Sequence, residues 1–497
     1  MKTPTIIQGG MGIGVSHWPL ARAVSRTGQL GVVSGAAINT ILLRRLQQGD
    51  ASGDIRRAMA KFPHPEISEK FLEDYYNPSA KDPHRPYKRS PLFSVHSNRS
   101  LEQLTVLASF VEVFLAKDGH DGLVGINFLE KMQLSNLPGL YGAMLAGVDY
   151  VLMGAGIPRE IPGVLDCFSG QQSASLRVFV HGGRSGEEVR VSFDPNIVFS
   201  RHLPHLKRPY FLPIIASATL ALHLAQKSTG SIEGFVVEGP TAGGHNAPPR
   251  GKIQLNASGE PVYGRKDEVD LEKIKELGLP FWLAGGFASP EQLQEAIKKG
   301  AAGIQVGTAF AFCEESGFTE QIKSAAIRKW VLNSGDVNKE HVFTDPAASP
   351  TGFPFKVAPL EDTLSSADLY ETRPRKCDLG YLRDVCVSAD GALVYRCPGE
   401  PIDAYVKKEG VVGDTVGRKC LCNALFAAIG LEQCQEDGYL ELPLVTAGDD
   451  LVNLRRFFQE GQTSYSAREL IQYLLTPKKV EMKNKRDRVV TERNVEV

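Results

Sequence analysis

The sequence lacks any long apolar run and carries almost no net charge. No stretch reaches the roughly 18 apolar residues that a helix needs to span a bilayer, so we expect no membrane span. Lys and Arg number 56, and Asp and Glu number 57, which gives no reason to expect nucleic acid or an anionic membrane as a partner. The N-terminal segment MKTPTIIQGGMG has no signal-peptide core. We therefore expect a cytoplasmic protein.

Cysteines are few, 8 in 497 residues, which excludes a disulfide scaffold. No G-x-G-x-x-G segment opens a strand–helix–strand unit, so an open dinucleotide-binding sheet is not favoured. There is also no Cys-x₂-Cys pair, the stronger signature of a zinc or iron–sulfur site.

Eight short β-rich apolar runs are present, and most of them end in Gly, Ser or Asn. They cover residues 5–10, 30–35, 123–129, 149–156, 211–217, 234–239, 280–286 and 302–308. Helical patterns separate several of them. The clearest spans 289–300, with Ser289 as N-cap, Pro290 at the first helical position and Gly300 at its end. Eight β/α units in order predict an α/β fold, a (β/α)8 TIM barrel.

Three regions follow from this pattern. Residues 1–315 form the predicted barrel, with insertions at 60–95 and 175–200. The Pro-rich first insertion is either a lid over the active-site face or a surface excursion, and the second alternates like a β-hairpin. Residues 316–476 form a mostly helical, cysteine-bearing extension. Residues 477–497 are a polar tail, which we expect to be solvated or disordered.

Glycine-rich strand ends carry the chemistry. The seventh and eighth predicted strands end in Gly285-Gly286 and Gly307-Thr308. The loops after these two strands are the usual phosphate site of such barrels, because exposed glycine N–H groups can hold phosphate oxygens. The pattern therefore predicts a phosphate-bearing cofactor, although tight turns alone would also use glycine.

His245 follows the sixth predicted strand in the segment EGPTAGGH, 238–245. Two glycines before it leave room for a flat ring, and imidazole can give or take a proton near neutrality. We therefore predict His245 as the catalytic residue. An arbitrary loop histidine would be structural more often than catalytic, and the other ten histidines have no comparable setting.

Several stretches together resemble the nitronate monooxygenase family, formerly called 2-nitropropane dioxygenases. This family includes FMN-dependent enoyl reductases and the trans-acting enoyl reductases of polyketide and polyunsaturated fatty acid synthases. The matching stretches are IIQGGMG (6–12), VGINFL (124–129), IIASATLALHLA (214–225), EGPTAGGH (238–245) and LAGGFASPEQLQEAIKKGAAGIQVGTAF (283–310). The resemblance covers about residues 1–315.

The resemblance implies a TIM barrel, non-covalent FMN and a catalytic histidine at His245. The FMN contacts that it implies are Gly9, Gly10, Met11, Asn127, Gly243, Gly244, Gly285, Gly286, Gln305, Gly307 and Thr308. The soft Met11 side chain would support the edge of the isoalloxazine ring. Asn127 would face the flavin pyrimidine, although an Asn-capped turn is an equal alternative.

Two activities remain open. The leading hypothesis is an FMN-dependent oxidoreductase that uses O₂ to oxidise alkyl nitronates to a carbonyl compound and nitrite. The alternative is an NAD(P)H-dependent enoyl reductase acting on chains bound to an acyl carrier protein. Ala216-Ser217 favours the alternative, because small nitronate monooxygenases often have Lys at that strand end, and the long extension also favours it. The residues after His245 also differ from the usual glycine turn. A non-catalytic flavin-binding or docking subunit is a third reading, and a homo-oligomer is compatible with the sequence.

The extension contains Cys377, Cys397, Cys420 and Cys422, with a Cys-x-Cys pair at its end. Four thiolates could hold Zn or an iron–sulfur cluster, and flanking Arg and Lys would lower the thiol pKa values. Cys386 and Cys434 are further candidates, and free cysteines in a small subdomain are the alternative. Cys167 and Cys313 are interpreted as ordinary barrel residues.

Overall fold

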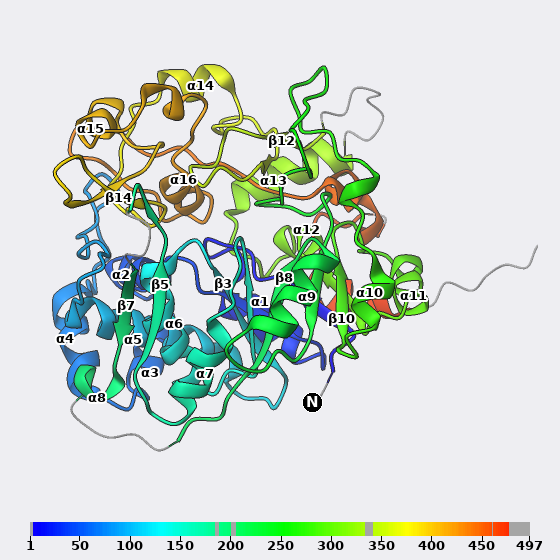
Figure 1. The fold of residues 1–497 in the computed structure, drawn as a ribbon, viewed down its shortest axis with the longest axis horizontal. Helices are drawn as coiled ribbons and strands as arrows, with labels where there is room; N and C mark the ends of the chain where they lie inside the picture. Colours follow the sequence, from blue (N-terminus) through cyan, green and yellow to red (C-terminus); the bar gives the residue numbers. More distant parts are fainter. Residues whose placement is uncertain (1–2, 184–187, 200–204, 333–340, 460, 477–497) are drawn as a thin grey trace, which may run out of the picture.

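The computed structural model describes residues 3–183, 188–199, 205–332, 341–459 and 461–476. The predicted polar tail, 477–497, lies outside these ranges. The described chain forms a barrel in one half of the molecule and an irregular extension, yellow to orange, over one end of it (Figure 1).

Eight parallel strands form the barrel in chain order. They are β1 (Ile6–Gln8), β2 (Gly31–Ser34), β3 (Val124–Leu129), β4 (Tyr150–Gly154), β8 (Tyr210–Ile215), β9 (Phe235–Glu238), β10 (Phe281–Ala284) and β11 (Gly303–Val306). The sheet runs β1-β11-β10-β9-β8-β4-β3-β2. The Gln8 N–H donates to the Leu30 carbonyl at 2.9 Å, and the Leu30 N–H donates to the Ile6 carbonyl at 3.1 Å. These bonds close the circle, so the predicted (β/α)8 barrel and all eight of its strands are confirmed.

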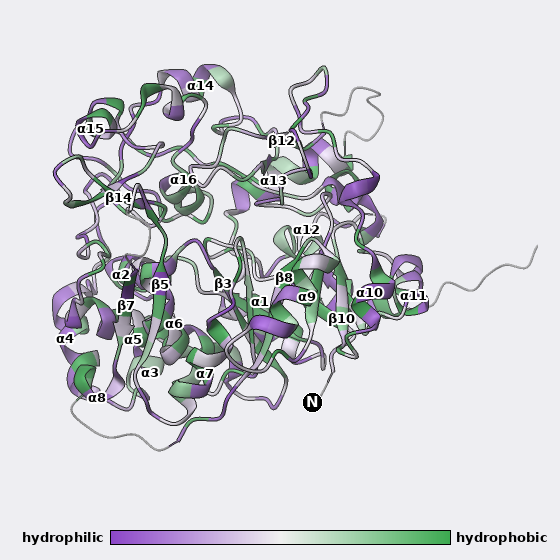
Figure 2. Ribbon diagram, viewed as in Figure 1, coloured by the Kyte–Doolittle hydropathy of each residue, from purple (hydrophilic) through white to green (hydrophobic). Residues whose placement is uncertain are grey.

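The strands are apolar on both faces because each face is covered. One set of alternate side chains, including Val32, Leu152 and Trp282, packs in a central cluster. The other set, including Val237 and Ile304, packs against the surrounding helices. This arrangement explains why the strands appear in the sequence as continuous apolar runs. In Figure 2 the hydrophobic residues follow the strands, while α4 on the periphery is largely hydrophilic.

Helices on the outside connect the strands. They are α1 (Trp18–Ser25), α2 (Ile38–Gln47), α3 (Asp54–Met59), α4 (Pro65–Tyr75), α5 (Arg99–Lys117), α6 (Gln133–Leu145), α7 (Ile161–Ser169), α8 (Pro195–Val198), α9 (Ala218–Lys227), α10 (Leu271–Lys275), α11 (Pro290–Lys298) and α12 (Thr308–Ala311), with the short 3-10 helix η1 (Arg265–Asp267). The Ser289 side chain caps α11 by accepting from the Gln292 N–H at 3.2 Å, as the sequence predicts. None of the helices in the described ranges is long and apolar enough to cross a membrane.

Both insertions contact the extension. The predicted hairpin is present as β5 (Ala174–Val178) paired antiparallel with β7 (Val189–Phe193). Between them β6 (Val180–His181) pairs with β14 (Asp384–Val387) of the extension. In the first insertion α4 packs on α2 and α5, and the Tyr87 N–H donates to Gln433 Oε1 at 2.9 Å.

The extension combines helices with two small sheets. Its helices are α13 (Glu320–Ile327), α14 (Ala367–Thr372), α15 (Ile402–Lys407), α16 (Leu421–Ala427) and α17 (Ala467–Leu475), with the helical turns η2 (Arg328–Leu332), η3 (Val412–Thr415) and η4 (Asp449–Phe457). Strand β12 (Phe343–Asp345) pairs with β13 (Phe355–Val357), and β14 pairs with β15 (Leu393–Arg396). Leu470 and Leu474 of α17 share a buried cluster with Leu20 and Val24 of α1. The change of architecture near residue 315 therefore does not end the barrel's hydrophobic core.

Candidate active site

One large cavity opens at the carboxyl ends of the barrel strands, where barrel enzymes place their chemistry. It encloses about 1610 Å³ when the open solvent at its mouth is counted. Its wall contains all twelve residues singled out from the sequence: Gly9, Gly10, Met11, Asn127, Gly243, Gly244, His245, Gly285, Gly286, Gln305, Gly307 and Thr308.

The loop that carries His245 is held by the extension. His245 forms an antiparallel bridge with Phe355 of β13, and the two rings meet edge-on at 4.9 Å. The neighbouring Gly244 N–H donates to Thr446 Oγ1 at 2.9 Å. Nε2 of His245 lies 2.7 Å from Ser349 Oγ. Burial lowers the pKa of His245 to about 4, so the imidazole is neutral near pH 7.

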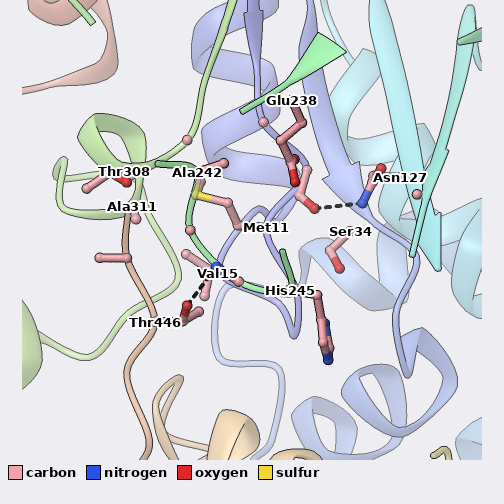
Figure 3. A pocket seen from close by; sticks show the side chains of 18 of the residues that line it. Met11, Val15, Ser34, Asn127, Glu238, Ala242, His245, Thr308, Ala311 and Thr446 are labelled. Atoms are coloured by element: carbon pink, nitrogen blue, oxygen red, sulfur yellow. Dashed lines mark hydrogen bonds between the residues drawn. The ribbon is translucent and has the colours of Figure 1, made fainter. Parts of the chain in front are cut away.

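Asn127 contacts Gly10 in the wall of the cavity, and Figure 3 labels Asn127 and draws its hydrogen bond as a dashed line. Asn127 Nδ2 donates to the Gly10 carbonyl at 3.0 Å. A Cβ on residue 10 would lie 2.2 Å from Asn127 Cβ, so only glycine fits there. Asn127 Oδ1 and Gln305 Oε1 are buried without a hydrogen-bond partner. Buried polar atoms are normally paired, so two acceptors in this wall lack the donors that a bound polar ring would supply.

The glycine pair after β10 adopts left-handed backbone conformations, whereas Gly307 after β11 has a φ of −107°. Gly285 and Gly286 have φ of 94° and 73°, and a Cβ on residue 285 would lie 2.8 Å from Thr241 Oγ1. The Thr308 hydroxyl accepts from the Gly448 N–H at 2.8 Å. Both turns therefore line the cavity, and the extension fixes the turn after β11 through Thr308. Such bare backbone can bind a phosphate through its N–H groups.

Glu238 is a site residue to which sequence reasoning assigned no role. It ends β9 and lines the cavity, at the end opposite His245 in Figure 3. Burial raises its carboxyl pKa to about 8. Its position at the start of the same glycine motif that ends in His245 was a signal that could have found it.

The extension supplies an apolar wall that the sequence pattern does not reveal. Phe355, Leu421, Cys422 and Leu425 line the cavity and belong to one buried cluster with Ile13 and Met132 of the barrel. Tyr381 is fixed in the same wall, because its hydroxyl donates to Asn39 Oδ1 of α2 at 2.7 Å. Across the described chain, the lining includes no residue of the 60–95 insertion, so the cover over this site comes from the extension.

The predicted metal site is not supported. Within the described ranges no group of three or more His, Cys, Asp or Glu side chains is placed to hold a metal ion, and all eight cysteines are free. The expected lowering of the thiol pKa values is also wrong. Burial raises the pKa of Cys377 to about 12 and shifts those of Cys397, Cys420 and Cys422 upward too. Desolvation outweighs the neighbouring Arg and Lys charges.

Comparison with known proteins places the barrel in a family context. Residues 176–333 match the family model described as nitronate monooxygenase. A probable nitronate monooxygenase from Staphylococcus saprophyticus is 29% identical over 136 residues, 27% of this chain and 37% of that protein. A nitronate monooxygenase from Paraburkholderia phytofirmans is 31% identical over 116 residues, 23% of this chain and 30% of that protein. The matches thus span about a third of these curated relatives. The predicted family resemblance is confirmed over this part of the chain.

Solved structures superpose more widely but loosely. FabK from Thermotoga maritima aligns over 95% of this chain and 92% of that chain, at 15% identity and a TM-score of 0.46. The enoyl reductase domain of MlnA from the macrolactin biosynthesis cluster of Bacillus amyloliquefaciens aligns over 94% and 92%, at 11% identity and a TM-score of 0.44. These values are too low to carry an argument, so the fold assignment stands on the strand order alone.

Proposed function

Starting from a barrel related to the nitronate monooxygenases, we propose that this protein is an FMN-dependent oxidoreductase that oxidises alkyl nitronates with O₂, giving a carbonyl compound and nitrite. One observation carries the proposal: the cofactor and catalytic residues inferred from separate sequence motifs all line a single cavity. The family match at residues 176–333 supports the same class of chemistry.

The residues of the cavity fit FMN. Asn127 Oδ1 and Gln305 Oε1 are buried acceptors without donors, and a flavin pyrimidine ring offers an N–H. Glycines at the ends of β10 and β11 leave backbone open for the phosphate. Met11 also lines the cavity, with its sulfur beside Gly307. When bound, FMN would supply a two-electron acceptor that the side chains themselves do not provide.

His245 and the apolar wall would act on the substrate. A neutral imidazole can orient a nitronate oxygen by hydrogen bonding, or take an α-proton from a neutral nitroalkane. Phe355, Leu421 and Leu425 would bind the alkyl group and exclude water from the reacting atoms. Strand ends and packed side chains position these groups, which favours a fixed geometry over the flavin.

The decisive experiment uses purified, FMN-loaded protein. We expect oxygen uptake and nitrite release on addition of propionate 3-nitronate, and no bleaching of the flavin band by NADPH under anaerobic conditions. Rapid bleaching by NADPH without nitronate turnover would contradict the proposal in favour of a reductase. Bound flavin with neither response would indicate a non-catalytic flavin subunit.

The apolar wall favours one second candidate. Several lining residues from the extension are apolar or weakly polar, among them Phe355, Leu382, Leu421, Cys422 and Leu425. An NAD(P)H-dependent enoyl reductase acting on chains held by an acyl carrier protein would use such a wall for the acyl chain. His245 would then lie near the thioester carbonyl. The anaerobic NADPH experiment separates the two activities.

A further inference from the structure

Ser349 is the buried partner of the histidine. Its side chain is fully buried, and its Oγ lies 2.7 Å from Nε2 of His245. The Arg418 guanidinium donates to the Ser349 carbonyl at 2.6 Å and to the Ala347 carbonyl at 2.9 Å. The extension therefore fixes Ser349 from behind, and the Phe355 ring holds the imidazole edge-on.

A short chain of hydroxyl groups assigns the protons. Ser349 Oγ lies 2.8 Å from Thr351 Oγ1 and accepts from the Thr351 N–H at 3.2 Å. The Phe353 N–H points at Thr351 Oγ1 at 3.5 Å. If Thr351 donates its hydroxyl proton to Ser349, and Ser349 donates to Nε2, every hydroxyl proton finds an acceptor. In the opposite direction Nε2 and the Thr351 N–H would both donate to Ser349 Oγ, and the half-buried Thr351 hydroxyl would have no acceptor among the described residues.

We propose that Ser349 is a positioning residue that fixes the Nδ1–H tautomer of His245, so that this histidine presents an N–H donor to a substrate oxygen. The ligand chemistry is an oxygen that carries or develops negative charge, in a nitronate or in a thioester carbonyl. This inference deepens the proposed function and rests on it. Within the described part of the chain Nδ1 makes no hydrogen bond, so it is free to face such an oxygen.

The charge state of the ring agrees with this assignment. Because burial lowers the pKa of His245, the imidazole is neutral and carries one N–H at a time, and the partner of the other nitrogen decides which one. A preorganised donor aimed at developing negative charge is an effective form of stabilisation in a water-poor site.

The first test reads the tautomer directly and needs no turnover. The full-length protein is prepared with ¹⁵N-labelled histidine, and long-range ¹⁵N–¹H correlation spectra are recorded at pH 7. Comparison with His245→Asn identifies the ring signals. We expect a protonated Nδ1 and an unprotonated Nε2 in the wild type, and a mixture of both tautomers in Ser349→Ala. Thr351→Val, which removes only the hydroxyl proton behind Ser349, should give a smaller shift in the same direction.

The second test uses turnover with whichever substrate the protein accepts. We expect Ser349→Ala to lower kcat by about tenfold, the loss of one hydrogen bond, with KM and FMN affinity nearly unchanged. Ser349→Thr, which keeps the hydroxyl, should restore the tautomer and most of the rate. Ser68→Ala is the matched control, because Ser68 is also buried and bonds the Met59 carbonyl at 2.9 Å, away from the cavity.

A wild-type ring protonated at Nε2, or a Ser349→Ala spectrum identical to that of the wild type, overturns the inference. These results are independent of the proposed reaction, since the spectra report the ring even if neither nitronate nor NADPH reacts. The two proposals can also fail separately. If the protein shows the predicted tautomer but binds no FMN, the positioning role of Ser349 stands and the proposed function is overturned.

Discussion

Gly10 and Asn127 meet so closely that a methyl group on residue 10 would lie 2.2 Å from Asn127 Cβ. The Asn127 amide also donates to the Gly10 carbonyl at 3.0 Å. The first and third strands thus fix each other's ends through a contact that tolerates no side chain. The Asn127 Oδ1 atom is left buried without a hydrogen-bond partner among the described residues.

This contact predicts that Gly10→Ala weakens FMN binding. The added methyl must push Asn127 out of the wall, so we expect the Kd for FMN to rise by about tenfold or more, equivalent to a lost hydrogen bond with local strain. The Kd is measured by the quenching of flavin fluorescence on binding. Gly413→Ala is the control, since a Cβ there meets nothing within 4 Å. Equal affinity in both variants would contradict the arrangement.

His245→Asn should suppress turnover about a hundredfold or more while FMN stays bound, since a positioned proton donor or acceptor contributes at least that much. Because the pKa of His245 is about 4 in the folded protein, the wild-type rate should show no acid limb near pH 6.5 from this group. His223→Asn, on the exposed face of α9, is the control. Steady-state rates from pH 5 to 8 test the loss of turnover and the absence of an acid limb. An acid limb in the wild type that disappears in His245→Asn would refute the low pKa of His245.

Glu238 predicts an unusual dependence of stability on pH. Its folded-state pKa is about 8, above the ordinary value near 4.5, so the folded protein keeps a proton that the unfolded chain has lost between these values. Its contribution to stability is therefore largest at low pH and declines as pH rises towards 8. In flavin-free protein we compare the free energy of unfolding of Glu238→Gln with that of the wild type. The difference should favour the variant more at pH 8 than at pH 5. Urea unfolding at the two pH values measures this, and a constant difference would argue against the shift.

The buried pair Arg373–Glu441 predicts a large stability loss on Glu441→Gln. Arg373 Nε and Nη2 donate to the two carboxylate oxygens at 2.7 and 2.6 Å, and the side chains are 2% and 0% exposed. Leaving the guanidinium buried without its partner should cost about 3–5 kcal/mol in the free energy of unfolding.

The exposed pair Lys376–Asp437, at 2.8 Å, supplies the control for that measurement. Asp437→Asn should cost less than about 1 kcal/mol, because water already solvates both charges. Similar losses for the two variants in urea unfolding would show that the extension does not depend on its buried ion pair.

Much of the barrel could be predicted from the sequence because its strands are short, apolar and end in glycine. The run at 302–308, for example, became β11 with Gly307 at the cavity. The same regularity located His245 and the glycines that line the cavity with it. Glu238 opens the glycine motif that ends in His245, but the sequence alone does not show that burial raises its carboxyl pKa.

The extension could not be predicted in the same way. Ser349, Phe355 and Thr446 reach the histidine loop from more than 100 residues away, and irregular long-range contacts leave no periodic trace. The predictions of a metal site and of lowered thiol pKa values failed for a related reason. Basic residues flank the cysteines in the sequence, but in the folded protein Cys420 and Cys422 belong to a buried apolar cluster. The pairing of β6 with β14 likewise could not be predicted from the sequence.

The clamp on the histidine loop also orders events during synthesis. All eight barrel strands, and the glycine turns at their ends, precede residue 310 in the chain, whereas the groups that hold Gly244 and His245 are Ser349, Phe355 and Thr446. A nascent chain therefore contains the glycine turns of the cavity wall before it contains the groups that hold the histidine loop. The loop of His245 can reach the position seen here only after Thr446 has been synthesised.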